Sequence, residues 1–116
     1  MIEVKFEIAF GDTLILDMKG HAGFAELGKD PVCAGASVLA LTVAQCADHM
    51  YAEKKLQKKP TIRVRNGHVK VVCRPKPEAW NEALHLFYVG ETGMRLLTAA
   101  YPGYLALTPF ATPEEG

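Results

Sequence analysis

Hydrophobic and polar positions alternate along two short segments at the start of the chain, residues 2–9 and 13–18. Both segments are rich in Ile, Val, Leu and Phe, and the turn-forming pair Gly11-Asp12 lies between them. Alternation of this kind on both sides of a turn predicts two strands that pair as a hairpin. Three glycines then break the pattern in residues 20–30, which we interpret as a flexible loop.

A long helix is predicted to begin directly after this loop. Asp30 suits the N-cap, because a carboxylate accepts hydrogen bonds from the unpaired amides of the first turn, and Pro31 suits the first helical position. The helix is expected to run to about Lys58, near which lysines match the negative end of the helix dipole, and Pro60 then stops it. The apolar residues at helical spacing in its middle are Ala34, Val38, Leu41, Ala44 and Ala47.

A second hairpin is predicted at Asn66-Gly67, a pair that strongly favours the tightest hairpin turns. The flanking residues 61–65 and 68–73 alternate between hydrophobic and polar side chains. This alternation predicts two further strands.

Residues 78–99 form an amphipathic segment, which predicts a helix that is weakened, and open to interruption, at Gly90 and Gly93. A last short strand is expected at 104–107 after a proline-glycine turn. The large apolar residues that share one face of the helix are Trp80, Leu84, Phe87, Met94 and Leu97.

The predicted order of elements is β-β-α-β-β-α-β. This mixture favours an α+β fold in which two helices pack on a mostly antiparallel sheet. A chain of 116 residues is long enough to bury one core without disulfides or a structural metal. We therefore expect a single domain over residues 1–110, followed by a disordered tail at 111–116.

Composition and charge exclude several classes of protein. Thirteen basic residues balance thirteen acidic ones, so no overall positive field favours direct nucleic-acid binding. No apolar run reaches the length of about 18 residues expected of a membrane span, and residues 1–5 do not resemble a signal peptide. We expect a cytoplasmic protein that does not enter a membrane.

The three cysteines Cys33, Cys46 and Cys73 are odd in number and widely spaced, without a CxxC pair. This spacing argues against a disulfide framework and against a zinc site. No metal and no cofactor are therefore expected.

Cys33 falls at the third position of the first predicted helix, where unpaired amides and the positive end of the dipole stabilise an anion. A thiolate is favoured there, which makes Cys33 the candidate nucleophile. His21 lies in the glycine-rich loop just before this helix and is the candidate base. Considered alone, a cysteine in a helix is more often a small core residue, so spacing by itself favours that structural interpretation.

Two neighbouring residues each have a structural explanation beside a functional one. Ser37 lies one turn after Cys33, so its hydroxyl either reaches the thiol or a substrate, or bonds back to the Cys33 carbonyl. Asp30 is fully explained as a helix cap. The candidate oxyanion donors are the amides of Val32 and Cys33, although an Asp30 cap competes for one of them.

The combination of two short motifs is more specific than any single residue. Residues 20–23 read Gly-His-Ala-Gly, and residues 28–37 read Gly-Lys-Asp-Pro-Val-Cys-Ala-Gly-Ala-Ser. Together they resemble the ribosomal-processing cysteine protease family, which joins a GHA loop to a D-x-V-C-A-x-x-S helix start. Length and element order fit over nearly the whole chain.

The resemblance implies an endopeptidase that removes the N-terminal extension of large-subunit ribosomal protein number twenty-seven, and it implies a homodimer. His21 and Cys33 match the catalytic pair of the family. Asp30 and Ser37 match accessory positions, and Gly20 and Gly28 match loop glycines that act as hinges. In the implied mechanism His21 takes the Cys33 proton, the thiolate attacks the scissile carbonyl, and water releases the acyl-enzyme.

Two functions of other classes stay open at this point. The first is a non-catalytic ribosome-assembly factor that binds a ribosomal protein tail or RNA through a patch formed by Lys54, Lys55, Lys58 and Lys59, with Arg63 and Arg65. A solvated helix end is the simpler explanation of these lysines. The second is a redox protein or acyltransferase that uses the same cysteine, and the lack of a CxxC partner disfavours the redox version.

Overall fold

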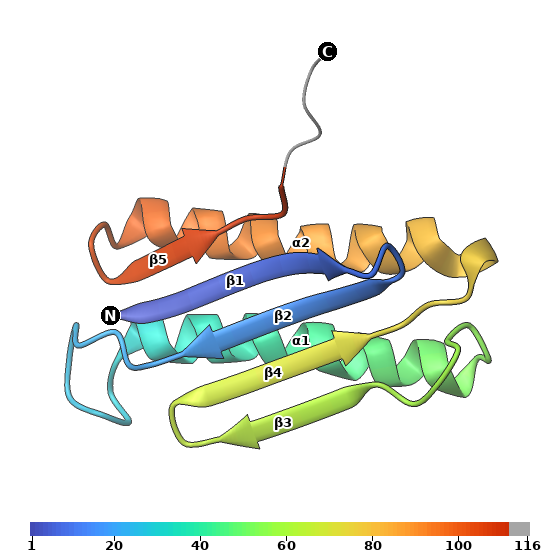
Figure 1. Cartoon of the computed structure of the whole chain (residues 1–116). Coiled ribbons are helices and arrows are strands. Elements are labelled where there is room, and N and C mark those ends of the chain that lie inside the picture. The colour runs from blue at the N-terminus through green and yellow to red at the C-terminus, as the bar shows by residue number, and fades with distance from the viewer. Residues whose placement is uncertain (112–116) are drawn as a thin grey trace, which may run out of the picture.

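The computed structural model of the chain describes residues 1–111 and has two layers, a five-stranded sheet and a pair of helices. Both helices, α1 (Pro31–Ala52) and α2 (Trp80–Ala100), cover the same face of the sheet (Figure 1). The predicted disordered tail at 111–116 lies, apart from Ala111, outside the described residues.

The sheet has the strand order β3-β4-β2-β1-β5. Its edge strand β5 runs parallel to β1, and all other neighbours are antiparallel. The predicted element order and the mostly antiparallel sheet are therefore confirmed, and β5 begins one residue later than expected. The strands are β1 (Ile2–Ala9), β2 (Thr13–Lys19), β3 (Thr61–Arg65), β4 (His68–Cys73) and β5 (Leu105–Thr108).

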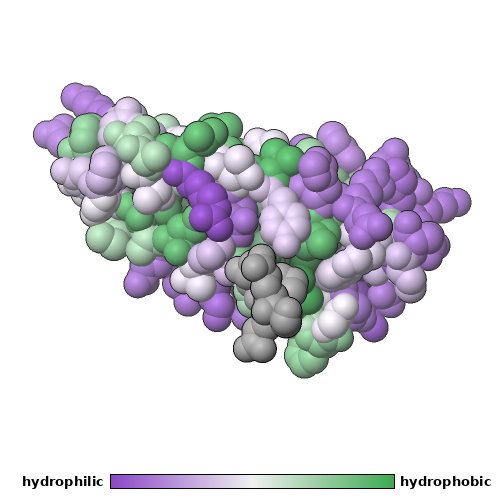
Figure 2. Space-filling model, turned by 90° about the horizontal axis from the view of Figure 1, so that it is seen from above, coloured by the Kyte–Doolittle hydropathy of each residue, from purple (hydrophilic) through white to green (hydrophobic). Residues whose placement is uncertain are grey.

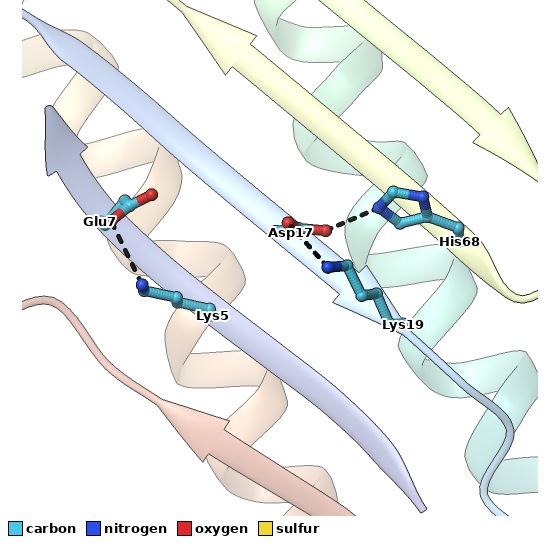
Figure 3. A network of polar contacts seen from close by, with 5 residues as sticks. All are labelled: Lys5, Glu7, Asp17, Lys19 and His68. Atoms are coloured by element: carbon cyan, nitrogen blue, oxygen red, sulfur yellow. Dashed lines mark hydrogen bonds and ion pairs between the residues drawn. The ribbon is translucent and has the colours of Figure 1, made fainter.

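Alternation along the strands separates the two faces of the sheet, because successive side chains point to opposite sides. Val4 and Met18 are register partners on the helix side, and both are buried. The uncovered face carries polar side chains, among which His68 Nε2 lies 2.8 Å from Asp17 Oδ1 (Figure 3). The residues drawn in that network are Lys5, Glu7, Asp17, Lys19 and His68.

Helix α1 ends at Ala52, so the expectation that it runs to about Lys58 is wrong. The chain turns at Lys54, which has a left-handed backbone with φ of 62°. This turn brings Leu56 into the core, where it is 4% exposed and forms an isolated bridge with Pro75. Burial of the Leu56 side chain contributes about 1.5–3 kcal/mol to folding, relative to leaving the side chain exposed on a longer helix.

Helix α2 is continuous through Gly90 and Gly93, so the predicted helix is confirmed and is not interrupted at these glycines. These glycines let the two helices approach closely. A Cβ at Gly90 would lie 2.6 Å from Val43 Cγ2, and a Cβ at Gly93 would lie 2.5 Å from Leu39 Cδ2. A 3₁₀ turn, η1 (Pro77–Ala79), leads into the helix.

The apolar residues predicted at helical spacing in α1 divide between two faces. Ala44 and Ala47 are buried, whereas Val38 and Leu41 are 64% and 42% exposed. By length and composition alone α1 is apolar enough to cross a membrane, as core helices of soluble proteins also can be. The buried side chains of α1 are Val32, Ala36, Ala40, Val43, Ala44, Ala47 and Met50.

The two ends of the molecule differ in character. Loop 20–30 lies at one end, and the end of α1 and the start of α2 lie at the other (Figure 1). Seen from above, hydrophilic residues gather at the end that carries the start of α2, while hydrophobic residues lie nearer the middle and the other end (Figure 2).

Candidate active site

Loop 20–30 connects β2 to α1, and its first residue is fixed in place. The N–H of Gly20 donates to the carbonyl of Gly67 at 2.9 Å, which ties the loop to the β3–β4 turn. Gly20 has φ of 94°, and a Cβ there would lie 2.6 Å from the carbonyl oxygen of Met1. No other residue fits this position without moving the backbone.

The carboxylate of Asp30 joins the loop to the helix start. Its Oδ1 accepts from the N–H groups of Val32 at 2.9 Å and Cys33 at 3.2 Å, as the predicted cap requires. Its Oδ2 accepts from Phe24 at 2.9 Å and Ala25 at 3.0 Å. Burial alone would raise the pKa of Asp30, but these backbone donors together hold the pKa below its usual range. Asp30 therefore remains an anion that positions the loop.

Cys33 stands in the first turn of α1, as predicted, and is half-buried. Its Sγ accepts a hydrogen bond from the N–H of Ala22 at 3.3 Å. The sulfur thus lies at the N-terminal end of the helix with a backbone donor directed at it. Sequence reasoning missed the donor, because the alanine side chain gives no sign of what its backbone does.

His21 lies beside Ala22 in the same loop, and its ring packs over the β3–β4 turn. A Cβ at Gly67 would lie 3.0 Å from His21 Nε2. Within residues 1–111 no hydrogen bond joins the His21 ring to the Cys33 sulfur. Catalytic hydrogen bonds are often long before substrate binds, so this arrangement suits a resting site.

One pocket of about 320 Å³ brings five of the six predicted site residues together, namely Gly20, His21, Gly28, Cys33 and Ser37. The sixth, Asp30, lies behind the pocket as the loop anchor. Within the described part of the chain the Ser37 hydroxyl makes no hydrogen bond back to the Cys33 carbonyl, so it is available at the pocket wall. A further part of the pocket wall, which sequence reasoning missed, comes from Val64, Arg65, Asn66, Gly67, His68 and Val69.

Comparison with known proteins identifies this arrangement. A family model described as cysteine protease Prp matches residues 1–106. The chain belongs to the Prp family of cysteine proteases. Among curated proteins, no sequence match to the chain is significant.

Solved structures share the Prp fold. The essential ribosomal processing protease Prp from S. aureus, in complex with a covalently linked product peptide, gives a TM-score of 0.69 at 22% identity and covers 94% of this chain and 99% of that chain. A Streptococcus mutans protein gives a TM-score of 0.66 at 20% identity, covering 97% of this chain and 96% of that chain. At these identities the likeness establishes the fold.

The Prp-family site contradicts one expectation about transition-state stabilisation. Val32 and Cys33 were the candidate oxyanion donors, but both N–H groups donate to Asp30 Oδ1. The capping carboxylate thus accepts hydrogen bonds from both amides, whereas competition for one amide was expected. An oxyanion needs donors from elsewhere, and the Ala22 N–H is the backbone donor found at the sulfur.

The other two cysteines differ from Cys33 in their surroundings. Cys73 is fully buried on β4, and burial raises the pKa of its thiol to about 11. Cys46 is half-buried on α1, and all three thiols are free. Within residues 1–111 no disulfide is present to support the redox alternative.

The positive charge of the lysine patch is partly neutralised by carboxylates beside Lys55. Lys55 Nζ lies 2.9 Å from Glu82 and 3.5 Å from Glu53. The hydrogen bond with Glu82 raises the pKa of Lys55, despite partial desolvation. A lysine already paired with two carboxylates contributes little to RNA binding, which weakens the assembly-factor alternative.

Proposed function

We propose that this chain is a cysteine endopeptidase in which Cys33 is the nucleophile and His21 the base. One observation carries the proposal: the Cys33 sulfur and the His21 ring line the same pocket, at a helix start where a backbone N–H donates to that sulfur. Membership of the Prp family supports proteolysis as the reaction.

The chemistry follows from this arrangement. His21 takes the thiol proton, and the Cys33 thiolate attacks the carbonyl carbon of the scissile peptide bond to form a C–S bond. The C–N bond then breaks, and His21 returns the proton to the leaving amine. Water attacks the thioester with its proton going to His21, which releases the carboxylic acid product and the free thiol.

Accessory residues take distinct roles in this proposal. Asp30 does not line the pocket and acts through the loop that carries His21. The Ser37 hydroxyl contacts the bound peptide. Gly28, with φ of 86° and open space around it, serves as the loop hinge, whereas Gly20 is held by its hydrogen bond to the Gly67 carbonyl.

We further propose that the substrate is the precursor of large-subunit ribosomal protein number twenty-seven, from which the N-terminal extension is removed during ribosome maturation. The S. aureus relative is a ribosomal processing protease, with a solved complex that holds a substrate peptide. Apolar side chains dominate the pocket wall, so it suits an apolar residue beside the scissile bond. These side chains are Ile2, Met18, Leu27, Leu41, Val64 and Val69.

We also propose that the chain forms a homodimer through the outer face of its helices. Only 33% of the most apolar 18-residue window of α1 is buried. Beside it, Val38 and Leu96 are 64% and 69% exposed at an apolar groove of about 610 Å³ between α1 and α2. Exposed apolar surface of this kind marks protein interfaces, and a second copy presents the same surface.

The cytoplasm is the compartment that fits this function, because ribosome maturation takes place there. The three free thiols suit a reducing compartment.

A cleavage assay tests the proposed function. The purified chain is incubated with the precursor ribosomal protein of its own organism, and the N-terminus of the precursor is followed by mass spectrometry. Cleavage is expected for the wild type and lost in Cys33→Ala and His21→Ala. Cys46→Ala, which changes a half-buried cysteine on the same helix, is the matched control and should cleave normally. A precursor that stays intact with the wild type as well as with every variant would contradict the proposal.

A further inference from the structure

Loop 20–30 has a second attachment that lies away from α1. The ring of Phe24 packs edge-on against Tyr101 and Tyr104, with centroid distances of 5.0 Å to each and interplanar angles of 76° and 88°. Tyr101 caps the end of α2, and Tyr104 lies directly before β5. The loop is thus bound to a corner of the fold that contributes no residue to the pocket.

We infer that Phe24 is a positioning residue for the proposed reaction: through Tyr101 and Tyr104 it holds Ala22 against the Cys33 sulfur and His21 in the pocket. This inference rests on the proposed function, because it assigns Phe24 a role in that same site.

The backbone and the side chain of Phe24 are fixed to different elements. Its N–H donates to Asp30 Oδ2 at 2.9 Å, which binds the backbone to the helix start. Its ring is bound to the α2–β5 corner. Only one residue separates Phe24 from Ala22, and two residues of chain span at most about 7 Å, so displacement of Phe24 moves the Ala22 N–H.

The remainder of the loop offers little other packing. Gly23 and Gly28 both have left-handed backbones, and a Cβ at either would meet nothing within 4 Å. The residues between them are exposed. Without the Phe24 ring, the middle of the loop would be held mainly by the two hydrogen bonds to Asp30 Oδ2.

The expected effect follows from the two aromatic contacts. Each edge-to-face pair is worth a factor of about two to twelve in an equilibrium constant. Phe24→Ala should therefore lower kcat by at least about fivefold, with KM changed by less than about twofold, because the apolar wall that binds peptide lies outside the loop except for Leu27. Phe24→Tyr keeps the ring and should restore kcat, whereas Phe24→Leu should not.

A matched control separates positioning from general loss of an aromatic side chain. Tyr51 is 43% exposed, close to the 44% of Phe24, and lies at the end of α1 far from the loop. Tyr51→Ala removes a ring of similar exposure and should leave kcat unchanged. Tyr104→Ala removes one of the two ring contacts and should lower kcat less than Phe24→Ala does, and the double variant should be no worse than Phe24→Ala, because no contact of the Phe24 ring is then left to lose.

Amide hydrogen exchange at Ala22 and Ala25 provides a readout that needs no substrate. Exchange at both amides should become at least about fivefold faster in Phe24→Ala and stay at the wild-type rate in Phe24→Tyr and Tyr51→Ala. Unchanged amide exchange and unchanged kcat in Phe24→Ala would overturn the inference. An equal loss of kcat in Tyr51→Ala would also overturn it. If the wild type cleaved no precursor, the proposed function would fail, and with it the role of Phe24 in catalysis, while the exchange rates would still decide whether Phe24 holds the loop.

Discussion

The backbone N–H of Ala22 donates a hydrogen bond to the sulfur of Cys33 at 3.3 Å, which joins two residues separated by eleven positions in the sequence. His21, the neighbour of Ala22, lines the same pocket as Cys33. The loop that makes the contact is held by Asp30 on one side and by Phe24 on the other. Activity should therefore depend on residues that never meet the substrate.

Asp30→Asn tests the first of these attachments. An amide keeps one acceptor oxygen but replaces the other with a donor, so two of the four backbone N–H groups lose their acceptor. We expect kcat to fall by at least about tenfold, because a lost hydrogen bond to a charged group costs about 1.5–3 kcal/mol. Asp48→Asn, at a half-buried aspartate on the same helix, should retain wild-type kcat.

The pH dependence of stability should also change in Asp30→Asn. The pKa of Asp30 is lower in the folded protein than its usual value of 3.8, so the carboxylate stabilises the fold fully above that value. This contribution is lost as the pH falls through the lower folded pKa. Thermal unfolding between about pH 2 and pH 6 should show a shallower acid loss in the variant. An unfolding temperature that falls equally with pH in the wild type and the variant would contradict the stabilising role assigned to the Asp30 carboxylate.

Ser37→Ala tests whether the hydroxyl acts in the pocket. We expect kcat/KM to fall by a factor of about two to twelve, the value of one hydrogen bond, with stability unchanged within about 0.5 kcal/mol. Thr42 is the comparison on the same helix, because its hydroxyl donates back to the Val38 carbonyl at 2.6 Å. Thr42→Ala should leave kcat/KM unchanged. Full activity of Ser37→Ala would remove Ser37 from the site.

Gly90→Ala tests the close approach of the helices. Alanine favours helix by about 1 kcal/mol over glycine. Its Cβ would nevertheless lie 2.6 Å from Val43 Cγ2, which sits on a stiff, buried side chain. Overpacking costs about 1–3 kcal/mol, so urea unfolding should show a variant that is less stable than the wild type or at best equal to it. Clear stabilisation would mean that the helices can separate at no cost.

Leu96→Asp tests the proposed dimer. Light scattering coupled to size-exclusion chromatography should give the mass of two chains for the wild type and one chain for the variant. A buried carboxylate at the interface has no partner there, which disfavours association. Phe10→Asp is the control, because Phe10 is 96% exposed in the β1–β2 turn, away from the helices. A dimeric Leu96→Asp would place the interface elsewhere.

Local patterns predicted the elements of this fold well, and long-range contacts explain the differences. Alternation and Asn66-Gly67 were enough for the second hairpin, since its register is set by neighbouring residues. The end of α1 was missed because Leu56 pairs with Pro75, nineteen positions away. Nothing near Leu56 in the sequence indicates that contact.

The site divides in the same way into residues that the local sequence predicts and residues that long-range contacts bring together. The sequence predicted the Asp30 cap and a pairing of His21 with Cys33; the cap is confirmed, and the pair lines one pocket while its catalytic role stays a prediction. The wall that Arg65 and Gly67 form was missed, because it depends on β4 pairing with β2. The Phe24 anchor was also missed, since it joins the loop to tyrosines more than seventy residues further along.

The most direct test of the central claim is to trap the acyl-enzyme. The wild-type chain is mixed with its precursor ribosomal protein, quenched in acid within one turnover, digested and mapped by mass spectrometry. We expect an adduct on the Cys33 peptide whose mass equals the removed extension less one water, absent from Cys33→Ala and strongly reduced in His21→Ala. Precursor cleavage that persists in Cys33→Ala, or an adduct on Cys46 instead, would contradict it.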